Sequence, residues 1–144
     1  MIRMLHSGWA YVTLLILIFA VVNVITGLVS KREFKDRDLR ISLFTLIVAH
    51  IQLIIGFIAY FLSAQFQYLL DNGMGAAMKE SEIRYFIIEH PLIMILSIVL
   101  ITIGFSKHKR KTSDAEKFKV IAIYYGLALI FILSRIPWSR WFTF

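Results

Sequence analysis

The hydrophobic pattern divides the chain into four long apolar runs separated by polar segments. The runs cover about residues 9–29, 41–62, 85–105 and 120–136. A helix needs about 20 apolar residues to cross the hydrocarbon core of a bilayer, and each run has or approaches this length. Because lipid offers the backbone no hydrogen-bond partners, such runs must be helical. The pattern predicts an all-α fold, a transmembrane antiparallel four-helix bundle.

The third run decides where two ionisable side chains lie. Pro91 is a residue type that often starts a helix. A helix from Pro91 to the lysine-rich segment after Ser106 is nevertheless too short to span a bilayer. We therefore expect this helix to begin near Tyr85, which places Glu89 and His90 inside the membrane-spanning segment, where ionisable groups are costly and usually functional.

The connections indicate a single domain of residues 1–144. The first and third loops are short, so the helices that they join should be antiparallel neighbours. The second connection is longer and carries a turn signal at Asn72 and Gly73. Ser113 and Glu116 have the spacing of a capping box, which predicts that the fourth helix begins there.

Composition supports a membrane protein. The chain is 59% hydrophobic and contains only 2 Pro, which leaves no soluble fold that could bury so much apolar surface. The absence of cysteine excludes disulfides, thiolate metal sites and covalently attached c-type haem.

The net charge of +7 is concentrated in two loops. Loop 30–40 and segment 106–119 hold most of the basic residues, so the positive-inside rule places both in the cytoplasm and both termini on the outer side. Trp9, Trp138 and Trp141 would then form an interfacial belt at the outer helix ends. Membrane lipids are the expected partners of the basic loops, and nucleic acid is not.

Polar groups within the runs form two sets by their distance from the basic end. Asn23, His50 and Ser97 lie about 12–15 Å from it, counted at 1.5 Å per residue, and are expected to form a midplane cluster. Imidazole near a bilayer centre is rare, so His50 is a candidate metal ligand or proton relay.

The second set lies about 24–26 Å from the basic end and contains Glu89, His90 and Arg135. Glu89 and Arg135 are expected to form an ion pair, because lone charges are expensive at this depth, and the alternative is an anchor for a propionate, a quinone or a proton. His6 lies farther out, at about 37 Å. His108 falls in the lysine-rich loop and is expected to be solvated.

Five segments of the sequence together carry a resemblance to a known family. They are HSGWAY at 6–11, AHIQLIIG at 49–56, EHPLIMIL at 89–96, SKHKRK at 106–111 and SRIPWS at 134–139. With them the chain resembles small bacterial four-span membrane proteins labelled cytochrome b or cytochrome-b-like. The resemblance implies a multi-pass protein of the bacterial inner membrane that holds haem b between two neutral imidazoles. It also implies electron transfer with quinone or a respiratory membrane complex.

His6, His50 and His90 are the candidate ligands that the resemblance implies. The preferred pair is His50 with His90, since both lie below the interface on helices adjacent in sequence. The alternative is His6 with His90, which gives a haem near the outer face. In each pair the depths differ by about 11 Å on the residue count. Glu89, Arg135 and Asn23 would be supporting cofactor-binding groups.

Two other classes of function stay open. The chain could be a structural or assembly subunit of a larger membrane complex, without haem. It could also be a proton-coupled carrier that uses His50 and Glu89, but the single bundle without inverted repeats would then require an oligomer. No nucleophile with a positioned base and no phosphate-binding loop indicates an enzyme.

Overall fold

The computed structural model describes residues 1–141, and these fold into helices only. Four of the helical segments are long, and short elements connect or follow them. The elements are α1 (Ile2–Val29), α2 (Asp36–Phe61), α3 (Ala64–Lys79), α4 (Ser81–Arg84), the π-helical segment η1 (Tyr85–Glu89), α5 (His90–His108), α6 (Asp114–Ser134) and α7 (Trp138–Trp141).

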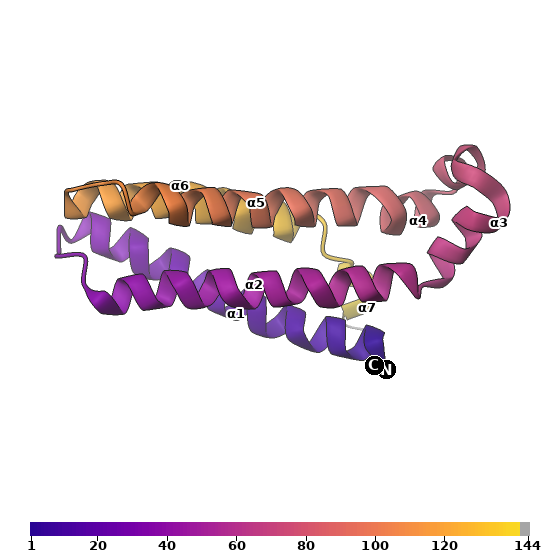
Figure 1. The fold of residues 1–144 in the computed structure, drawn as a ribbon, viewed down its shortest axis with the longest axis horizontal. Coiled ribbons are helices and arrows are strands. Elements are labelled where there is room, and N and C mark those ends of the chain that lie inside the picture. Colours follow the sequence, from indigo (N-terminus) through magenta and orange to yellow (C-terminus); the bar gives the residue numbers. More distant parts are fainter. Residues whose placement is uncertain (142–144) are drawn as a thin grey trace.

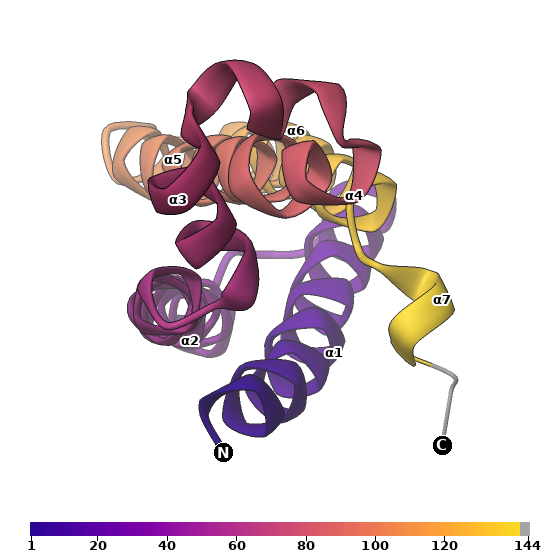
Figure 2. The same cartoon turned by 90° about the vertical axis from the view of Figure 1, so that its right-hand side faces the viewer.

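The long helices form a bundle of two layers. Figure 1 shows α1 and α2 in one layer, with α5 and α6 in the other, and each helix is antiparallel to the neighbours it contacts. Loops 30–35 and 109–113 lie together at one end, while the N-terminus, α3 and α7 lie at the other. Figure 2 shows this second end, with α3 crossing from α2 to α4 and α7 beside α1. The two basic loops therefore share one end, as predicted.

Four segments are long and apolar enough to cross a membrane: Ile2–Val29, Asp36–Phe61, Ser81–His108 and Asp114–Ser134. Large apolar side chains on all four point out of the bundle, among them Leu15, Ile54, Leu92 and Ile130, each more than 60% exposed. Water would penalise this surface, whereas lipid solvates it. The molecule is a multi-pass membrane protein with an all-α bundle.

The helices contain the predicted spans to within two residues, and most extend beyond them. The largest difference is at α1, which begins at Ile2, so Trp9 does not lie at a helix end. Its indole Nε1 donates to the carbonyl of Val48 at 2.9 Å and so joins α1 to α2. The belt prediction was wrong for Trp9, whereas Trp138 and Trp141 do lie at the end that holds the termini.

The helix of the third span passes through Pro91, as its length required. Proline lacks the backbone N–H and its ring clashes with the carbonyl four residues earlier, here that of Ile87. The preceding turn widens into the π-helical segment Tyr85–Glu89. The hydroxyl of Tyr60 on α2 donates to the Ile87 carbonyl at 3.3 Å. The chain thus crosses Pro91 with this carbonyl satisfied, and such π segments often lie at functional sites.

The core lies between the two layers towards the basic end. Seven further buried residues belong to the same cluster as the fully buried Leu17, Val24, Ile101, Phe118 and Tyr125. Tyr125 also donates its hydroxyl to the Ser42 carbonyl at 2.8 Å, which ties α6 to α2. Two glycines permit this packing: a Cβ on Gly27 would meet the ring of Phe118, and one on Gly104 would lie 2.5 Å from Cβ of Tyr124.

Gly104→Ala is expected to destabilise the bundle by about 2 kcal/mol. The new Cβ would meet Cβ of Tyr124, which cannot move aside without its backbone, so α5 would have to separate from α6. Gly126→Ala is the matched control, since its Cβ would meet nothing within 4 Å. Thermal unfolding in detergent, followed by circular dichroism, measures both. Equal unfolding midpoints for the two variants would contradict close packing at Gly104.

Candidate functional site

A large cavity opens at the end of the bundle that holds the termini. Its volume is about 650 Å³, within the usual range for small-molecule sites. Side chains of α1, α2, the π segment, α5 and the segment after α6 line it, and most are apolar, such as Leu14, Ile95 and Ile98. Its polar lining includes His6, Gln52, Tyr60, His90 and Arg3. A flat apolar ligand with few polar groups suits such walls.

His90 is held by the end of another helix. Helix α6 ends at Ser134, so the carbonyl of Arg135 has no helical partner. Nδ1 of His90 donates to this carbonyl at 2.7 Å, and the hydroxyl of Tyr85 donates to the same oxygen at 2.6 Å. Because a carbonyl only accepts, Nδ1 carries the proton. Nε2 then keeps a lone pair that can bind a metal ion.

His6 occupies a notch between α1 and α2. The ring lies against Gly56, where a Cβ would come within 3.3 Å of the His6 Cε1. The amide of Gln52, one turn before Gly56, donates from Nε2 to the His6 carbonyl at 3.0 Å and contacts Nδ1 at 3.2 Å. Its other atom, Oε1, is buried and has no hydrogen-bond partner among residues 1–141. Rotation of this amide would let Oε1 accept from Nδ1–H of His6, in exchange for the hydrogen bond from Nε2 to the His6 carbonyl.

The imidazoles of His6 and His90 lie close together, although their helices are far apart in the sequence. The ring centres of His6 and His90 are 6.2 Å apart and the ring planes make an angle of 85°. Metal to imidazole bonds are about 2 Å long, so two imidazoles on opposite sides of one ion have centres about 6 Å apart. The hydrogen bond from Nδ1 of His90 leaves its Nε2 for a ligand, and Nε2 of His6 is equally available once Nδ1 of His6 carries the proton.

The donor set decides which metal group would fit. Among residues 1–141 no cluster of three or more His, Cys, Asp or Glu could hold a metal ion. Haem supplies four nitrogens of its own and needs only two protein ligands. Two imidazoles, an apolar cavity and an unpartnered buried amide oxygen that can orient one of them therefore fit haem b.

His50 does not join His90. Nδ1 of His50 donates to the Leu46 carbonyl at 2.8 Å, and Nε2 lies 3.5 Å from the hydroxyl of Thr102 on α5. Thr102 is 12 residues beyond His90 on the same helix, which corresponds to about 18 Å. The structure thus separates the preferred ligand pair and brings the alternative pair, His6 with His90, together.

The predicted midplane cluster of Asn23, His50 and Ser97 was also wrong. Asn23 lies near the basic end, where its Nδ2 donates to Asp38 at 2.8 Å and its Oδ1 accepts from Arg32 at 2.9 Å. Ser97 donates to a carbonyl of its own helix. A count of residues gives the depth of a group only where the helix is parallel to the bundle axis, whereas Figure 1 shows α1 inclined to it.

The predicted ion pair of Glu89 with Arg135 was also wrong. Glu89 lies 3.6 Å from Arg84, one turn earlier. The guanidinium of Arg135 donates to the carbonyl of Ser134, and its backbone oxygen accepts the hydrogen bonds from His90 and Tyr85. His108 is 2% exposed rather than solvated, and it packs beside Phe34 and Phe105.

Sequence reasoning gave Gln52, Gly56, Tyr60 and Tyr85 no role, although each fixes part of the site. Gln52 and Gly56 are spaced by one helical turn, so they share a face of α2. The signal available in the sequence was a small residue, Gly56, one turn after a polar one, Gln52, within an apolar helix. Such a pair can mark a notch that receives a side chain of another helix.

The comparisons with known proteins identify no relatives. No family model, no curated protein and no solved structure matches this chain. The resemblance to cytochrome-b-like proteins therefore remains a hypothesis that rests on the segments given above. The assignment of a function depends on the cavity and its two histidines.

Proposed function

We propose that the protein is a membrane-bound b-type electron carrier that holds haem b in the cavity between His6 and His90. The observation that carries the proposal is the 6.2 Å separation of the two imidazoles in the wall of a largely apolar cavity. Bound there, haem would supply reversible one-electron transfer at its iron.

The residues of the chain have distinct tasks under this proposal. His6 and His90 would hold the iron through Nε2, and the Arg135 carbonyl and the Gln52 amide contact Nδ1 of the two rings and would fix their orientation. Apolar side chains such as Leu14 and Ile98 exclude water, which tunes the reduction potential. Arg3 lines the same cavity and offers a cation to a haem carboxylate.

The location of the cavity favours particular partners. If the basic loops face the cytoplasm, the cavity lies near the outer face of a bacterial inner membrane. A periplasmic electron donor, a quinone or a respiratory membrane complex could then exchange electrons there. The alternative function, a structural or assembly subunit without haem, predicts co-purification with a complex and no chromophore.

The test is a reduced-minus-oxidised visible spectrum of the full chain purified in detergent, with haem quantified per chain. We expect sharp low-spin b-type bands and one haem per chain. A colourless protein after expression with ample haem would refute the proposal and favour the subunit role.

A further inference from the structure

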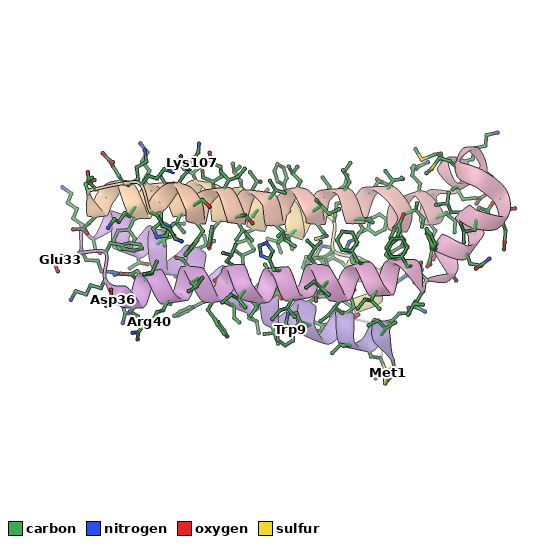
Figure 3. All side chains as sticks on the ribbon, viewed as in Figure 1. Met1, Trp9, Glu33, Asp36, Arg40 and Lys107 are labelled. Carbon is green, nitrogen blue, oxygen red and sulfur yellow. The ribbon has the colours of Figure 1, made fainter. Side chains whose placement is uncertain are left out.

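A second hollow lies on the outer surface of the bundle, between α1 and α2. It is an open groove of about 330 Å³, separate from the histidine cavity. The groove is lined by Ile16, Phe19, Arg37, Arg40, Ile41 and Phe44. Figure 3 places Arg40 near the end that holds the basic loops and far from Met1. The hollow therefore opens where the charged end meets the apolar surface.

Charge and apolarity are separated along this groove. Arg37 and Arg40 are three residues apart at the start of α2, so they share one helix face. Phe44 follows Arg40 by one turn, towards the middle of the helix, and Phe19 on α1 faces the same hollow. Phe19 is 60% and Phe44 is 55% exposed, so both present apolar surface to the membrane. An amphiphile with an anionic head matches this order.

In the described part of the chain, three arginines have their charge balanced by a carboxylate, and the two of the groove do not. Arg32 pairs with Asp38, Arg84 with Glu89 and Arg140 with Glu82. Within residues 1–141, neither Arg37 nor Arg40 pairs with a carboxylate, and both are exposed. A guanidinium binds phosphate through two parallel hydrogen bonds, so a pair of unpaired guanidinium groups suits a phosphate group.

We propose that this groove is a binding site for one anionic phospholipid of the surrounding bilayer. Its phosphate lies on Arg37 and Arg40, and an acyl chain follows the groove past Phe44 and Phe19. The site is independent of the histidine cavity and of haem. Charge complementarity selects an anionic lipid, and the apolar wall, which a free phosphate would leave uncovered, selects a lipid over inorganic phosphate.

The experiment is native mass spectrometry of the full chain in detergent, titrated with phosphatidylglycerol or with phosphatidylcholine of the same acyl chains. We expect at least tenfold tighter binding of one phosphatidylglycerol. The double substitution Arg37→Gln with Arg40→Gln should remove most of this preference, by about tenfold in affinity. Arg110→Gln with Lys111→Gln is the matched control, because these exposed cations lie in the other basic loop, outside the groove.

A second variant tests the apolar part. Ile16→Trp fills the groove and leaves both arginines in place, so it should also weaken phosphatidylglycerol binding. Glycerol phosphate without acyl chains should not bind measurably. Equal binding of the two lipids, equal losses in the two double variants, or unchanged binding to Ile16→Trp would each overturn the proposal. Unchanged circular dichroism shows that the variants are folded.

Discussion

Replacing His90 with alanine is expected to abolish the b-type absorption that the proposed haem would give the purified protein, and His6→Ala is expected to do the same. Each substitution would remove one of the two proposed haem ligands, and a low-spin haem b would need both. His50→Ala is the matched control, because His50 also lies in a membrane-spanning helix but does not line the cavity. We expect that variant to keep the full haem content per chain.

The measurement must separate loss of haem from loss of fold, because His90 also bonds the end of α6. Helical content and gel-filtration profile provide that check. His6→Met adds a second check, the reduction potential, because methionine can ligate haem iron and raises that potential relative to histidine. Loss of the bands in His50→Ala, with His6→Ala unchanged, would exclude the ligand pair proposed here.

Asp38→Ala is expected to lower the stability of the folded protein by about 2 kcal/mol, the usual effect of losing hydrogen bonds to a buried charged group, because the Arg32 side chain is 29% exposed and can be rehydrated. Asp38 is 1% exposed. Its carboxylate accepts from Arg32 at 2.9 Å, from Asn23 at 2.8 Å and from the backbone N–H of Lys35 at 2.9 Å. Without it, the charge of Arg32 and the amide of Asn23 lose their shared acceptor at the junction of α1 and α2.

Asp36→Ala provides the control for this prediction. Asp36 lies in the same first turn of α2 and has the same favourable position relative to the helix dipole, but its side chain is exposed. We expect it to cost less than about 1 kcal/mol. The midpoints of thermal unfolding in detergent compare the two variants. If both shift by the same amount, the buried network around Asp38 contributes nothing beyond helix capping.

The position of Asp38 also shows which features of the α1–α2 hairpin the short loop determines. The short loop after α1 makes α1 and α2 antiparallel, and pairing then proceeds from Asn23 with Asp38 through Thr13 with Val48 to His6 with Gln52. The sequence predicted the antiparallel arrangement but not its register. Register depends on which side chains interlock, such as His6 against Gly56, and that choice involves both helices at once.

The candidate ligands show the same difference between what the sequence predicts and what helix packing decides. Counting residues from the basic loops placed His6 about 11 Å farther out than His90, because such a count measures length along a helix rather than depth. In the structure α1 is inclined to the bundle axis, so its extra length adds less depth, and the two rings come within 6.2 Å. No local sequence feature encodes the tilt of a helix, since packing against neighbouring helices sets it.

The sequence by itself determined four membrane-spanning helices, their antiparallel order and the grouping of the basic loops at one end. These properties follow from local composition, because apolar runs and charged loops each respond to lipid or water on their own. Only the tertiary structure decided which polar groups meet. His6 lies beside His90, Asn23 binds Asp38, and His50 contacts neither of these pairs. Such meetings depend on helix tilt, register and the π-helical turn before Pro91, which arise from packing among all four helices.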